Sequence, residues 1–469
     1  MIRDFFAEKF SGKTIGLLGI GREGIATWSV LSRYLPNEKY VVADLRKEVV
    51  QSFKKSYKAG SNISFFSGEG YQEAFAQCDV VFKSPGVSLK NLGNFFTGLE
   101  PRLTSQTEVL LELFREQVIG VTGTKGKSTT ASLLQHIFEQ AGRQSLLAGN
   151  IGVPPFELLE KTDPSTVIIL EMSSHQLETL TISPATAILL NIFEEHLDHY
   201  ESYKAYQLAK MNISRWQEPK DVCIYNESNE LLRNLLKEYP GKGSTYAVNG
   251  LSAIGNGAQC SEDDLVLIRN NEKTIIHGVC KNRLLPGYHN LTNILSAATA
   301  ALIHGIEPLH IQQSVATFKG LAHRLELVGE FKGVRYYNDS ISTVPQSTIE
   351  AIKTFPDVYT LILGGYDRGV DYQSLIGYLL EKDIAHLVFI GKAGKRMFEE
   401  LSFSGYKNMK GCHLLEDFEA AVLKAVEVST SGHSCLLSPA AASYDMFENF
   451  EKRGEKFRQI IKDLSDDAA

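Results

Sequence analysis

Short apolar strands that end in glycine-rich loops and lead directly into helices recur along this chain. The first strand, Thr14–Ile20, precedes a helix-like stretch at Gly24–Tyr34 and a second strand at Tyr40–Asp44. The pattern starts again at Gln117–Val121, which is followed by a glycine-rich loop and a predicted helix at Ser128–Ala141. Strand–helix–strand units of this kind form mainly parallel sheets with helices on their faces. The chain is therefore expected to be an α/β protein.

The alternation continues toward the C-terminus. Further strands are predicted at Val167–Leu170, Ala187–Asn191, Arg335–Asn338, Tyr359–Leu363 and Leu387–Ile390. A length of 469 residues allows two to four domains of ordinary size. Because the pattern starts again near residues 105 and 321, we expect three α/β domains, at residues 1–105, 106–321 and 322–469.

The composition excludes several classes of protein. Apolar residues make up 43% and charged residues 22%, which argues against disorder, and the formal net charge of −7 argues against a general nucleic-acid binder. The apolar runs are much shorter than the roughly 18–20 residues that cross a bilayer, and charges interrupt the N-terminal segment where an export signal would be apolar. We therefore expect a cytoplasmic protein that binds neither membranes nor nucleic acids.

Six cysteines are scattered along the chain, and none forms a Cys-x-x-Cys pair. This spacing suggests neither a zinc site nor a disulfide framework. We expect six reduced thiols, as is usual in the cytosol.

The first glycine loop, GIGREG at residues 19–24, has the G-x-G-x-x-G spacing of a dinucleotide-binding turn. Asp44 ends the next predicted strand, where such folds place the acid that binds a ribose. This context favours a nucleotide, and NAD is the obvious candidate. Glycines also occur in any strand–helix turn that closely approaches another backbone, so a purely structural explanation stays open.

The second glycine loop reads VIGVTGTKGKSTT at residues 118–130. A strict Walker A motif would have glycine where Val121 stands, but Gly123, Gly126, Lys127 and Ser128 keep the working part of the motif. Backbone N–H groups and the helix N-terminus can hold phosphate, the lysine can reach the β- and γ-phosphates, and the serine hydroxyl can ligate Mg²⁺. The flanking strand and helix favour an ATP site over a chance match.

Three residues downstream could complete such a site. Glu171 follows a predicted strand, at the sheet edge where open α/β proteins bind ligands. His196 follows the next strand and could ligate a metal, and Lys210 lies in a predicted helix at Tyr203–Asn212. Taken singly, each has an ordinary alternative: a capping carboxylate, a loop histidine and a solvated lysine.

An ordered set of motifs over essentially the whole chain resembles the Mur ligases, and within that family the glutamate-adding branch. The motifs are TGTKGKST (122–129), GNIG (149–152), EMSSHQLE (171–178), NIFEEHLDHY (191–200), YQLAK (206–210), GYHNLTN (287–293), AHRLE (322–326), YNDSIST (337–343) and SPAAASYDMFENFEKRG (438–454). The resemblance implies a Rossmann-like N-terminal domain, a central P-loop ATPase-like domain and a C-terminal Rossmann-like domain. It implies that they bind the UDP-linked substrate, ATP and the incoming amino acid, respectively.

The resemblance also implies which residues form the sites. Those matching the UDP-substrate site, in place of NAD, are Gly21, Gly24, Asp44, Arg46, Ser84, Gly86 and Asn150. Those matching the ATP site are Gly123, Thr124, Lys125, Gly126, Lys127, Ser128, Thr129, Asn290, Asn293, Arg324 and Asp339. Those matching metal-binding positions are Ser128, Glu171, His196 and Lys210, and those matching the amino-acid site are Thr343, Arg368, Ser443 and Phe450.

The reaction implied by the resemblance is peptide synthesis for peptidoglycan precursors, and thus serves the cell wall, cell shape and division. The carboxylate of UDP-N-acetylmuramoyl-L-alanine attacks the γ-phosphate of ATP, and the glutamate amine then displaces phosphate from the acyl phosphate. Lys127, His196 and Lys210 match catalytic positions. Lys210 matches a lysine that CO₂ carbamylates, which turns a cation into an anionic ligand for Mg²⁺. A monomer is expected.

One stretch departs from the family pattern. Ile341 and Val344 stand where the D-glutamate enzymes have lysine and asparagine, and Arg368 stands where they have a lysine after Gly-Gly. Loss of a cation changes a pocket that must hold a dicarboxylate. The altered stretch resembles a subfamily that adds L-glutamate, so L-glutamate is favoured and D-glutamate is the alternative.

Three other functions compete with this interpretation. A folylpolyglutamate synthase would share the P-loop but would not need the first domain. An NAD-dependent dehydrogenase would leave the GKS loop unexplained. A sensor that binds UDP-sugars and ATP without catalysis would not need intact phosphate, metal and lysine positions.

Overall fold

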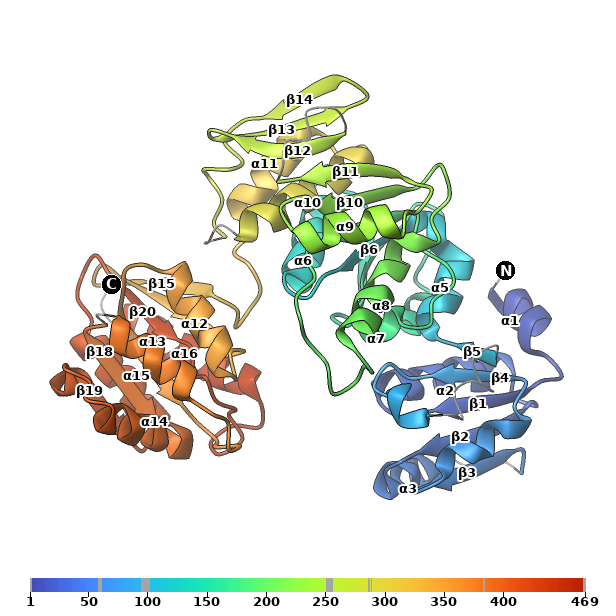
Figure 1. Ribbon diagram of the computed structural model, residues 1–469, viewed down its shortest axis with the longest axis horizontal. Coiled ribbons are helices and arrows are strands. Elements are labelled where there is room, and N and C mark those ends of the chain that lie inside the picture. The colour runs from blue at the N-terminus through green and yellow to red at the C-terminus, as the bar shows by residue number, and fades with distance from the viewer. Residues whose placement is uncertain are drawn as a thin grey trace. The chain divides into compact units, whose positions relative to one another are not determined.

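The computed structural model describes residues 2–57, 61–93, 102–249, 256–285, 287, 289–382 and 384–466. Its strands form three sheets, and Figure 1 shows helices against each of them. The predicted α/β class is confirmed. The expected boundaries near residues 105 and 321 stay predictions, because the chain divides into two compact units, Met1–Asn282 with Leu291–Ala316 and Arg283–Asn290 with Thr317–Ala469.

The first sheet has five parallel strands in the order β3-β2-β1-β4-β5. They span Thr14–Leu18 (β1), Lys39–Asp44 (β2), Ile63–Ser67 (β3), Val80–Lys83 (β4) and Leu103–Thr104 (β5), with helices Ile2–Phe10 (α1), Arg22–Tyr34 (α2) and Lys47–Ser56 (α3). The strand order reverses between β1 and β4. Ligands of open α/β sheets bind where the order reverses, beyond the carboxyl ends of the strands. The loops after β1 and β4 are therefore the natural binding edge of this sheet.

The second sheet has nine strands in the order β14-β13-β12-β11-β10-β9-β6-β8-β7, and only the β12–β13 and β13–β14 pairs are antiparallel. The strands span Val118–Thr122 (β6), Ser145–Gly149 (β7), Val167–Glu171 (β8), Thr186–Leu189 (β9), Val222–Asn226 (β10), Ser244–Val248 (β11), Gly257–Ser261 (β12), Asp264–Arg269 (β13) and Glu272–Ile276 (β14). The helices of this region are Gln106–Phe114 (α5), Lys127–Gln140 (α6), Ser174–Leu177 (α7), Tyr203–Arg215 (α8), Glu230–Glu238 (α9), His289–Ile303 (α10) and Pro308–Thr317 (α11). Central strand β6 leads into the second glycine loop, with β8 and β9 on either side.

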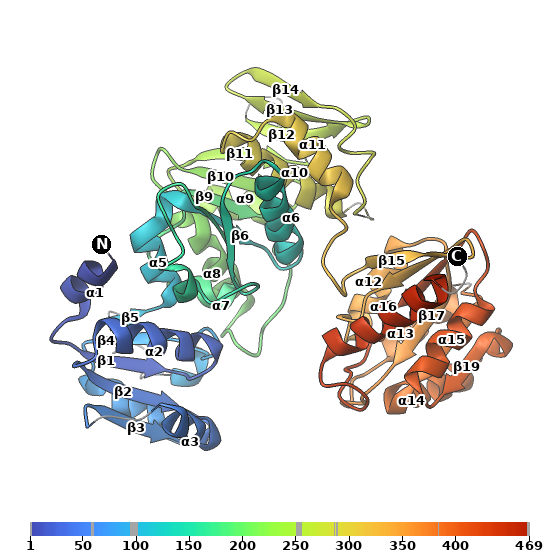
Figure 2. The same cartoon turned by 180° about the vertical axis from the view of Figure 1, so that it is seen from behind.

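The third sheet has six strands in the order β15-β16-β20-β17-β18-β19, with only the β15–β16 pair antiparallel. The strands span Glu326–Phe331 (β15), Val334–Asn338 (β16), Val358–Gly364 (β17), His386–Ile390 (β18), Cys412–Leu415 (β19) and Ser434–Leu437 (β20). Helices Pro345–Thr354 (α12), Gln373–Glu381 (α13) and Gly391–Phe403 (α14) pack on one face, and Phe418–Val428 (α15) and Phe450–Asp466 (α16) pack on the other. Figure 2 shows these helices from behind.

The first two sheets share one hydrophobic core, which explains why they belong to one compact unit. Phe156, from the second sheet's region, packs its ring against Phe6 of α1 and Phe82 of β4, with ring centroids 5.8 and 6.0 Å away. All three side chains are buried. Apolar burial is the main stabilising term in folding, so separation of these two sheets would expose a large aromatic surface.

The structure corrects the expectation of six reduced thiols. Cys260 of β12 and Cys280 form a disulfide with their Cα atoms 6.1 Å apart. Spacing rules missed this pair because the β12–β13–β14 hairpins fold the chain back on itself and bring together residues that are 20 apart in sequence. Cys78, Cys223, Cys412 and Cys435 are free thiols.

No helix in the described part of the chain is long and apolar enough to cross a membrane.

Candidate active site

The first glycine loop is shaped by a close approach between α2 and β1. A Cβ atom on Gly24 would lie 2.2 Å from the carbonyl oxygen of Gly19, so only glycine fits at this position. Ser84, which follows β4, donates its hydroxyl to the same carbonyl at 2.7 Å. Gly21 is the N-cap of α2, and the space around it is open, as it is around Gly86. The two loops where the sheet order reverses are thus bonded together, with free space beside two of their glycines.

Asp44 holds this loop in place. Its Oδ2 accepts the backbone N–H of Ile20 at 2.9 Å, and its Oδ1 accepts the N–H and Nε of Arg46 at 3.0 and 3.3 Å. The carboxylate is buried, whereas the arginine side chain is 60% exposed. The arginine is therefore available to a ligand at this edge, and the aspartate fixes the shape of the loop.

The second glycine loop leaves β6 and enters α6 at Lys127. Gly126, the N-cap, has φ +88°, and a Cβ there would lie 2.4 Å from Oδ1 of Asn293. Lys127 folds back over the loop, and its Nζ donates to the carbonyl oxygens of Gly123 and Thr124 at 2.8 and 3.0 Å. A lysine in this position can release these carbonyls and reach a phosphate. The structure thus brings Asn293 of α10 beside the loop.

The remaining loop residues are held from the C-terminal side of β9 and from α8. The Thr124 hydroxyl is 2.8 Å from that of Tyr206, and the backbone N–H of Lys125 donates to Asn191 Oδ1 at 2.8 Å. Ser128 and Thr129 lie in the first turn of α6. The N-terminus of this 14-residue helix is therefore presented by a rigid loop, as anion binding requires.

Glu171 ends β8 and lies beside the glycine loop because β6 and β8 are neighbouring parallel strands, with Val121 paired to Glu171. The side chain is fully buried. Its Oε1 accepts the side-chain N–H of Asn150 at 3.0 Å, but its Oε2 has no hydrogen-bond partner among the described residues. A buried oxygen without a partner is costly unless a cation or a donor reaches it. This oxygen therefore fits a metal ligand.

Lys210 of α8 is buried next to the same loop. Its Nζ donates to the Gly123 carbonyl at 2.9 Å and lies 3.5 Å from the Thr122 hydroxyl. Burial, and next the charge of Lys127, lower the pKa of Lys210 well below the ordinary lysine value. The lowered pKa favours the neutral amine, which is the form that reacts with CO₂.

His196 follows β9 and lies in a cluster of three histidines, with His199 of the same loop and His175 of α7. It has φ +60°, and its ring lies 4.9 Å from that of His175, which in turn stacks on His199 at 3.9 Å. Burial lowers the pKa of His196, and burial followed by the charge of His199 lowers the pKa of His175 to about 3. Neutral imidazoles are the metal-binding form. Sequence reasoning missed His175, although it lies inside the EMSSHQLE motif.

No group of three or more His, Cys, Asp and Glu side chains is placed to hold a metal within the described ranges. A metal at Glu171 would therefore need other donors, such as the Ser128 hydroxyl, a modified Lys210 or bound phosphate oxygens. This donor set is oxygen-rich, which suits Mg²⁺.

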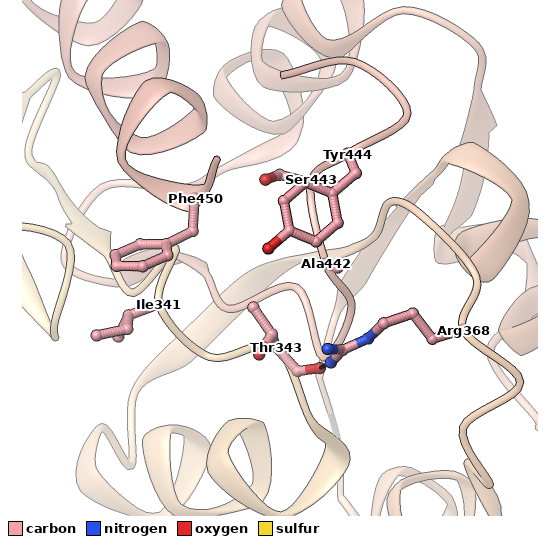
Figure 3. A pocket seen from close by; sticks show the side chains of 7 residues that line it. All are labelled: Ile341, Thr343, Arg368, Ala442, Ser443, Tyr444 and Phe450. Carbon is pink, nitrogen blue, oxygen red and sulfur yellow. Dashed lines mark hydrogen bonds between the residues drawn. The ribbon is translucent and has the colours of Figure 1, made fainter. Parts of the chain in front are cut away.

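A separate pocket of about 210 Å³ lies in the second compact unit (Figure 3). It is lined by Ile341, Thr343, Arg368, Ala442, Ser443, Tyr444 and Phe450. All four residues predicted from the sequence for the amino-acid site are among them. Arg368 extends toward Thr343 and donates to its carbonyl oxygen at 3.1 Å. The pocket thus combines one cation with an apolar wall that includes Ile341 and Phe450.

Sequence reasoning missed Ala442 and Tyr444 of the pocket lining and the supporting residue Arg453. Tyr444 is 64% exposed, and its ring lies 6.3 Å from that of Tyr366. Arg453 of α16 is buried and donates to the carbonyl oxygens of Ser340 and Ala442 at 2.8 and 3.2 Å. Tyr444 and Arg453 both lie inside the C-terminal motif at 438–454. The folded chain shows that Tyr444 borders the pocket, whereas Arg453 links the segments of Ser340 and Ala442 by hydrogen bonds.

Three more residues that were predicted for the ATP site lie in the second compact unit. Asp339 is buried, accepts the Ser438 hydroxyl at 2.7 Å, and has its pKa raised to about 6 by burial. Arg324 precedes β15, and its backbone N–H donates to the Leu321 carbonyl at 3.2 Å. Asn290 lies in the first turn of α10, with its N–H donating to Gly287 at 3.3 Å. Arg324, Asp339 and Asn290 belong to the same compact unit as the pocket.

A glycine loop for phosphates, a buried carboxylate and a buried lysine at the ends of neighbouring strands define a nucleotide-dependent group-transfer enzyme. Comparisons with known proteins agree: residues 121–301 match the Mur ligase middle domain, and residues 323–441 match the Mur ligase, glutamate ligase domain. The chain is 33% identical over 466 residues to the UDP-N-acetylmuramoylalanine--D-glutamate ligase of Acetivibrio thermocellus, covering 98% of both chains. It is 32% identical over 484 residues to the ligase of the same name from Clostridium perfringens, covering 99% of this chain and 100% of that one.

The protein therefore belongs to the Mur ligase family, whose members are ATP-dependent amide ligases. Solved structures show the same fold. UDP-N-acetylmuramate-alanine ligase MurC from Thermotoga maritima has a TM-score of 0.55 at 17% identity, covering 96% of this chain and 99% of that one. MurF ligase from Thermotoga maritima in complex with ADP has a TM-score of 0.54 at 17% identity, covering 97% and 95%.

Proposed function

We propose that this protein joins D-glutamate to UDP-N-acetylmuramoyl-L-alanine, with ATP converted to ADP and phosphate, in the cytoplasmic synthesis of peptidoglycan precursors. The names of relatives that match the chain from end to end support this substrate pair. They also support D-glutamate better than the L-glutamate that the altered stretch at residues 339–344 favours from sequence. The observation that carries the ligase chemistry is Lys127, Glu171 and Lys210 gathered around one phosphate-binding loop.

The three substrates are assigned to three parts of the chain. We assign the UDP group to the first part, residues 1–105, where Gly21, Gly86 and Arg46 offer open space and a cation at the edge of the first sheet. ATP is assigned to residues 106–321, around the α6 N-terminus. Glutamate is assigned to residues 322–469, in the pocket around Arg368.

The central loop supplies the charges that phosphoryl transfer needs. Lys127 leaves the carbonyls of Gly123 and Thr124 to hold the β- and γ-phosphates, while the N–H groups at the start of α6 hold the same anion. Asn150 orients Glu171 so that its free oxygen faces the site. Mg²⁺, when bound by Glu171, His196, Ser128 and modified Lys210, would neutralise charge on the phosphates.

Lys210 is suited to carbamylation. Its neutral amine attacks CO₂ to form a C–N bond and releases one proton, which leaves an anionic carbamate in place of a cation. Burial removes the water that would otherwise stabilise the ammonium form. The modified side chain supplies an oxygen ligand beside the Gly123 carbonyl.

The second compact unit presents the nucleophile. Arg368 pairs with one glutamate carboxylate, the buried Ser443 hydroxyl offers a hydrogen bond to the other, and Phe450 with Ile341 contacts the methylene groups. The pocket would thereby hold the glutamate whose amine displaces phosphate from the acyl phosphate to form the amide.

The test is the substrate dependence of product formation. Purified protein with ATP, Mg²⁺, UDP-N-acetylmuramoyl-L-alanine and D-glutamate should release one ADP for each new amide, measured by coupled ADP assay and by product mass. Omission of either the acceptor or glutamate should abolish both signals. Tight nucleotide binding without ADP or amide would support a sensor instead, and hydride transfer with NAD would support a dehydrogenase.

A further inference from the structure

Buried side chains join the loops of the first sheet to those of the second sheet within one compact unit. Lys83, the last residue of β4, places its Nζ 3.3 Å from Oε2 of Glu178, which follows α7. The two side chains are only 2% and 10% exposed. Removing two charges from water costs several kcal/mol for each ion, on the order of what their attraction returns. Stability alone therefore does not explain why two charges are buried here.

A second link joins the first glycine loop to α7. The side-chain amide of Gln176 donates to Glu23 Oε1 at 2.7 Å, while its own Oε1 accepts the backbone N–H of Ser173 at 3.0 Å. The same amide thus caps α7 and holds the first turn of α2. Next to Glu23, the Arg22 guanidinium donates to the carbonyl oxygen of Gly152, in the loop that carries Asn150.

A third link joins the loop after β4 to the histidine loop. Ser88 donates its hydroxyl to the carbonyl oxygen of His199 at 2.6 Å, and Lys90 Nζ lies 3.3 Å from the carbonyl oxygen of Leu197. His199 Nε2 is also 3.5 Å from Glu178 Oε2. The ion pair and the histidine loop therefore meet at a single carboxylate.

These links share one feature, which rests on the proposed function. Each begins in residues 19–24 or 83–90, which are assigned to the UDP group. Each ends in residues 150–152, 171–178 or 196–199, which contain the proposed metal ligands Glu171 and His196 or the Asn150 amide that bonds to Glu171. The substrate has its nucleotide on one side of this boundary and its reacting carboxylate on the other. Its carboxylate meets the γ-phosphate only if the spacing between the two sides is correct.

We propose that Lys83 and Glu178 are positioning residues for the ligase reaction, and that their buried ion pair sets the spacing between the nucleotide-sugar loops and the phosphate-transfer site. Neither residue touches the reacting atoms in this assignment. Glu178 acts through α7 on the segment that begins with Glu171, and Lys83 acts through the adjoining Ser84 loop. A misplacement of about 1 Å at a reacting centre can cost ~100-fold in rate, so a small change in this pair should be measurable.

A second ion pair, which is exposed, joins the same two regions and serves as a control. Arg33 and Glu160 form an ion pair of 2.7 Å across the same two regions, but it lies at the far end of α2 from the glycine loop. These side chains are 56% and 57% exposed. Exposed pairs contribute little to stability, so their removal should change neither folding nor rate.

The experiment compares three full-length variants under the proposed assay. Glu178→Asp keeps the charge but withdraws the carboxylate by one methylene group, and Lys83→Met with Glu178→Gln removes both charges together. Arg33→Met with Glu160→Gln is the control. We expect kcat to fall by about 10-fold or more in the first two variants, with the KM for ATP within about 2-fold of the wild type. The double variant leaves no buried charge unpaired, so its melting temperature should stay close to that of the wild type. The control should keep wild-type kcat.

Three results would overturn the inference. Wild-type kcat in the stably folded double variant would show that the pair has no effect on the reaction. Loss of kcat, ATP affinity and melting temperature in parallel in both test variants would show a purely structural role. A wild-type protein that forms no ADP with these substrates would instead overturn the proposed function, and this inference with it.

Discussion

The proposed phosphate-transfer centre and the proposed amino-acid pocket are built in opposite ways. Glu171, at the end of β8, and Lys210, on α8, are buried, and their side chains are held by the Asn150 amide and the Gly123 carbonyl. The pocket around Arg368 is formed mostly by loops, with Phe450 at the start of α16, and Tyr444 at its edge is 64% exposed. Chemistry common to a family needs fixed charges, whereas selection of one amino acid needs only a surface that fits it. Differences among related ligases should therefore concentrate in the pocket.

The largest loss is expected at the centre, from Lys127→Ala. Without this cation the loop would lose the proposed contact to the β- and γ-phosphates, and ADP formation should fall by about 100-fold or more. The coupled ADP assay measures this, with Lys237→Ala on the surface of α9 as the control. Near-normal turnover in Lys127→Ala would show that the reaction does not depend on this cation.

Lys210→Ala should lower the rate of ADP formation, and a small added anion should restore part of that rate. The variant would lack the proposed carbamate oxygen but leave space for a small anion, so formate or acetate should restore part of the ADP-forming rate. Lys127→Ala should not respond, because it lacks a cation. Full activity of Lys210→Ala without an added anion, or equal rescue of both variants, would contradict the role given to Lys210.

Arg368→Met should affect one substrate only. Loss of a charged hydrogen bond to a carboxylate is worth about 1.5–3 kcal/mol, so the KM for glutamate should rise about 10–100-fold. The KM for ATP should not change, because that site is assigned to the other region. Arg368→Lys should show a smaller effect, since it keeps the charge but loses the planar fork. An equal rise in the KM for glutamate and the KM for ATP would show that Arg368 does not act on glutamate binding alone.

The smallest effect concerns stability at the boundary of the first two sheets. Burial raises the pKa of Glu23 from 4.5 to about 7. The folded protein therefore holds this proton more tightly than the unfolded chain does, and the stabilisation is complete below pH 4.5 and is lost as the pH rises through about 7. Glu23→Gln still accepts a hydrogen bond from Gln176 but does not titrate.

Denaturation at pH 5 and at pH 8 measures this difference. The free energy of unfolding of the wild type, relative to that of Glu23→Gln, should fall by on the order of 1–3 kcal/mol between pH 5 and pH 8. Glu48→Gln, on the exposed surface of α3, is the control. An unchanged difference between wild type and Glu23→Gln would show that Glu23 does not titrate in this range.

Local sequence patterns predict the parts of the fold that local physics determines. The strand before Gly123 and the helix after it follow from an apolar run, a glycine with positive φ and a helix that begins at Lys127. Glu171 could be placed at a strand end for the same reason. The whole-chain resemblance then assigned the roles of residues that, singly, had ordinary alternatives.

Contacts between distant segments could not be predicted in this way. The stacking of His175 on His199, the Cys260–Cys280 disulfide and the approach of Tyr444 to the pocket all depend on tertiary structure. The preferred enantiomer of glutamate also could not be predicted from local sequence. The change at Ile341 indicates a different pocket wall, but its effect on a bound ligand depends on every other residue around it.

A competition between glutamate enantiomers tests the central proposal most directly. Equal amounts of isotopically labelled D-glutamate and unlabelled L-glutamate, with ATP, Mg²⁺ and UDP-N-acetylmuramoyl-L-alanine in one reaction, give products that differ in mass. D-glutamate ligation predicts a labelled product in excess of about 100-fold, together with one ADP for each amide. A mainly unlabelled product would contradict the assigned enantiomer, and ADP release without either amide would contradict the proposed reaction.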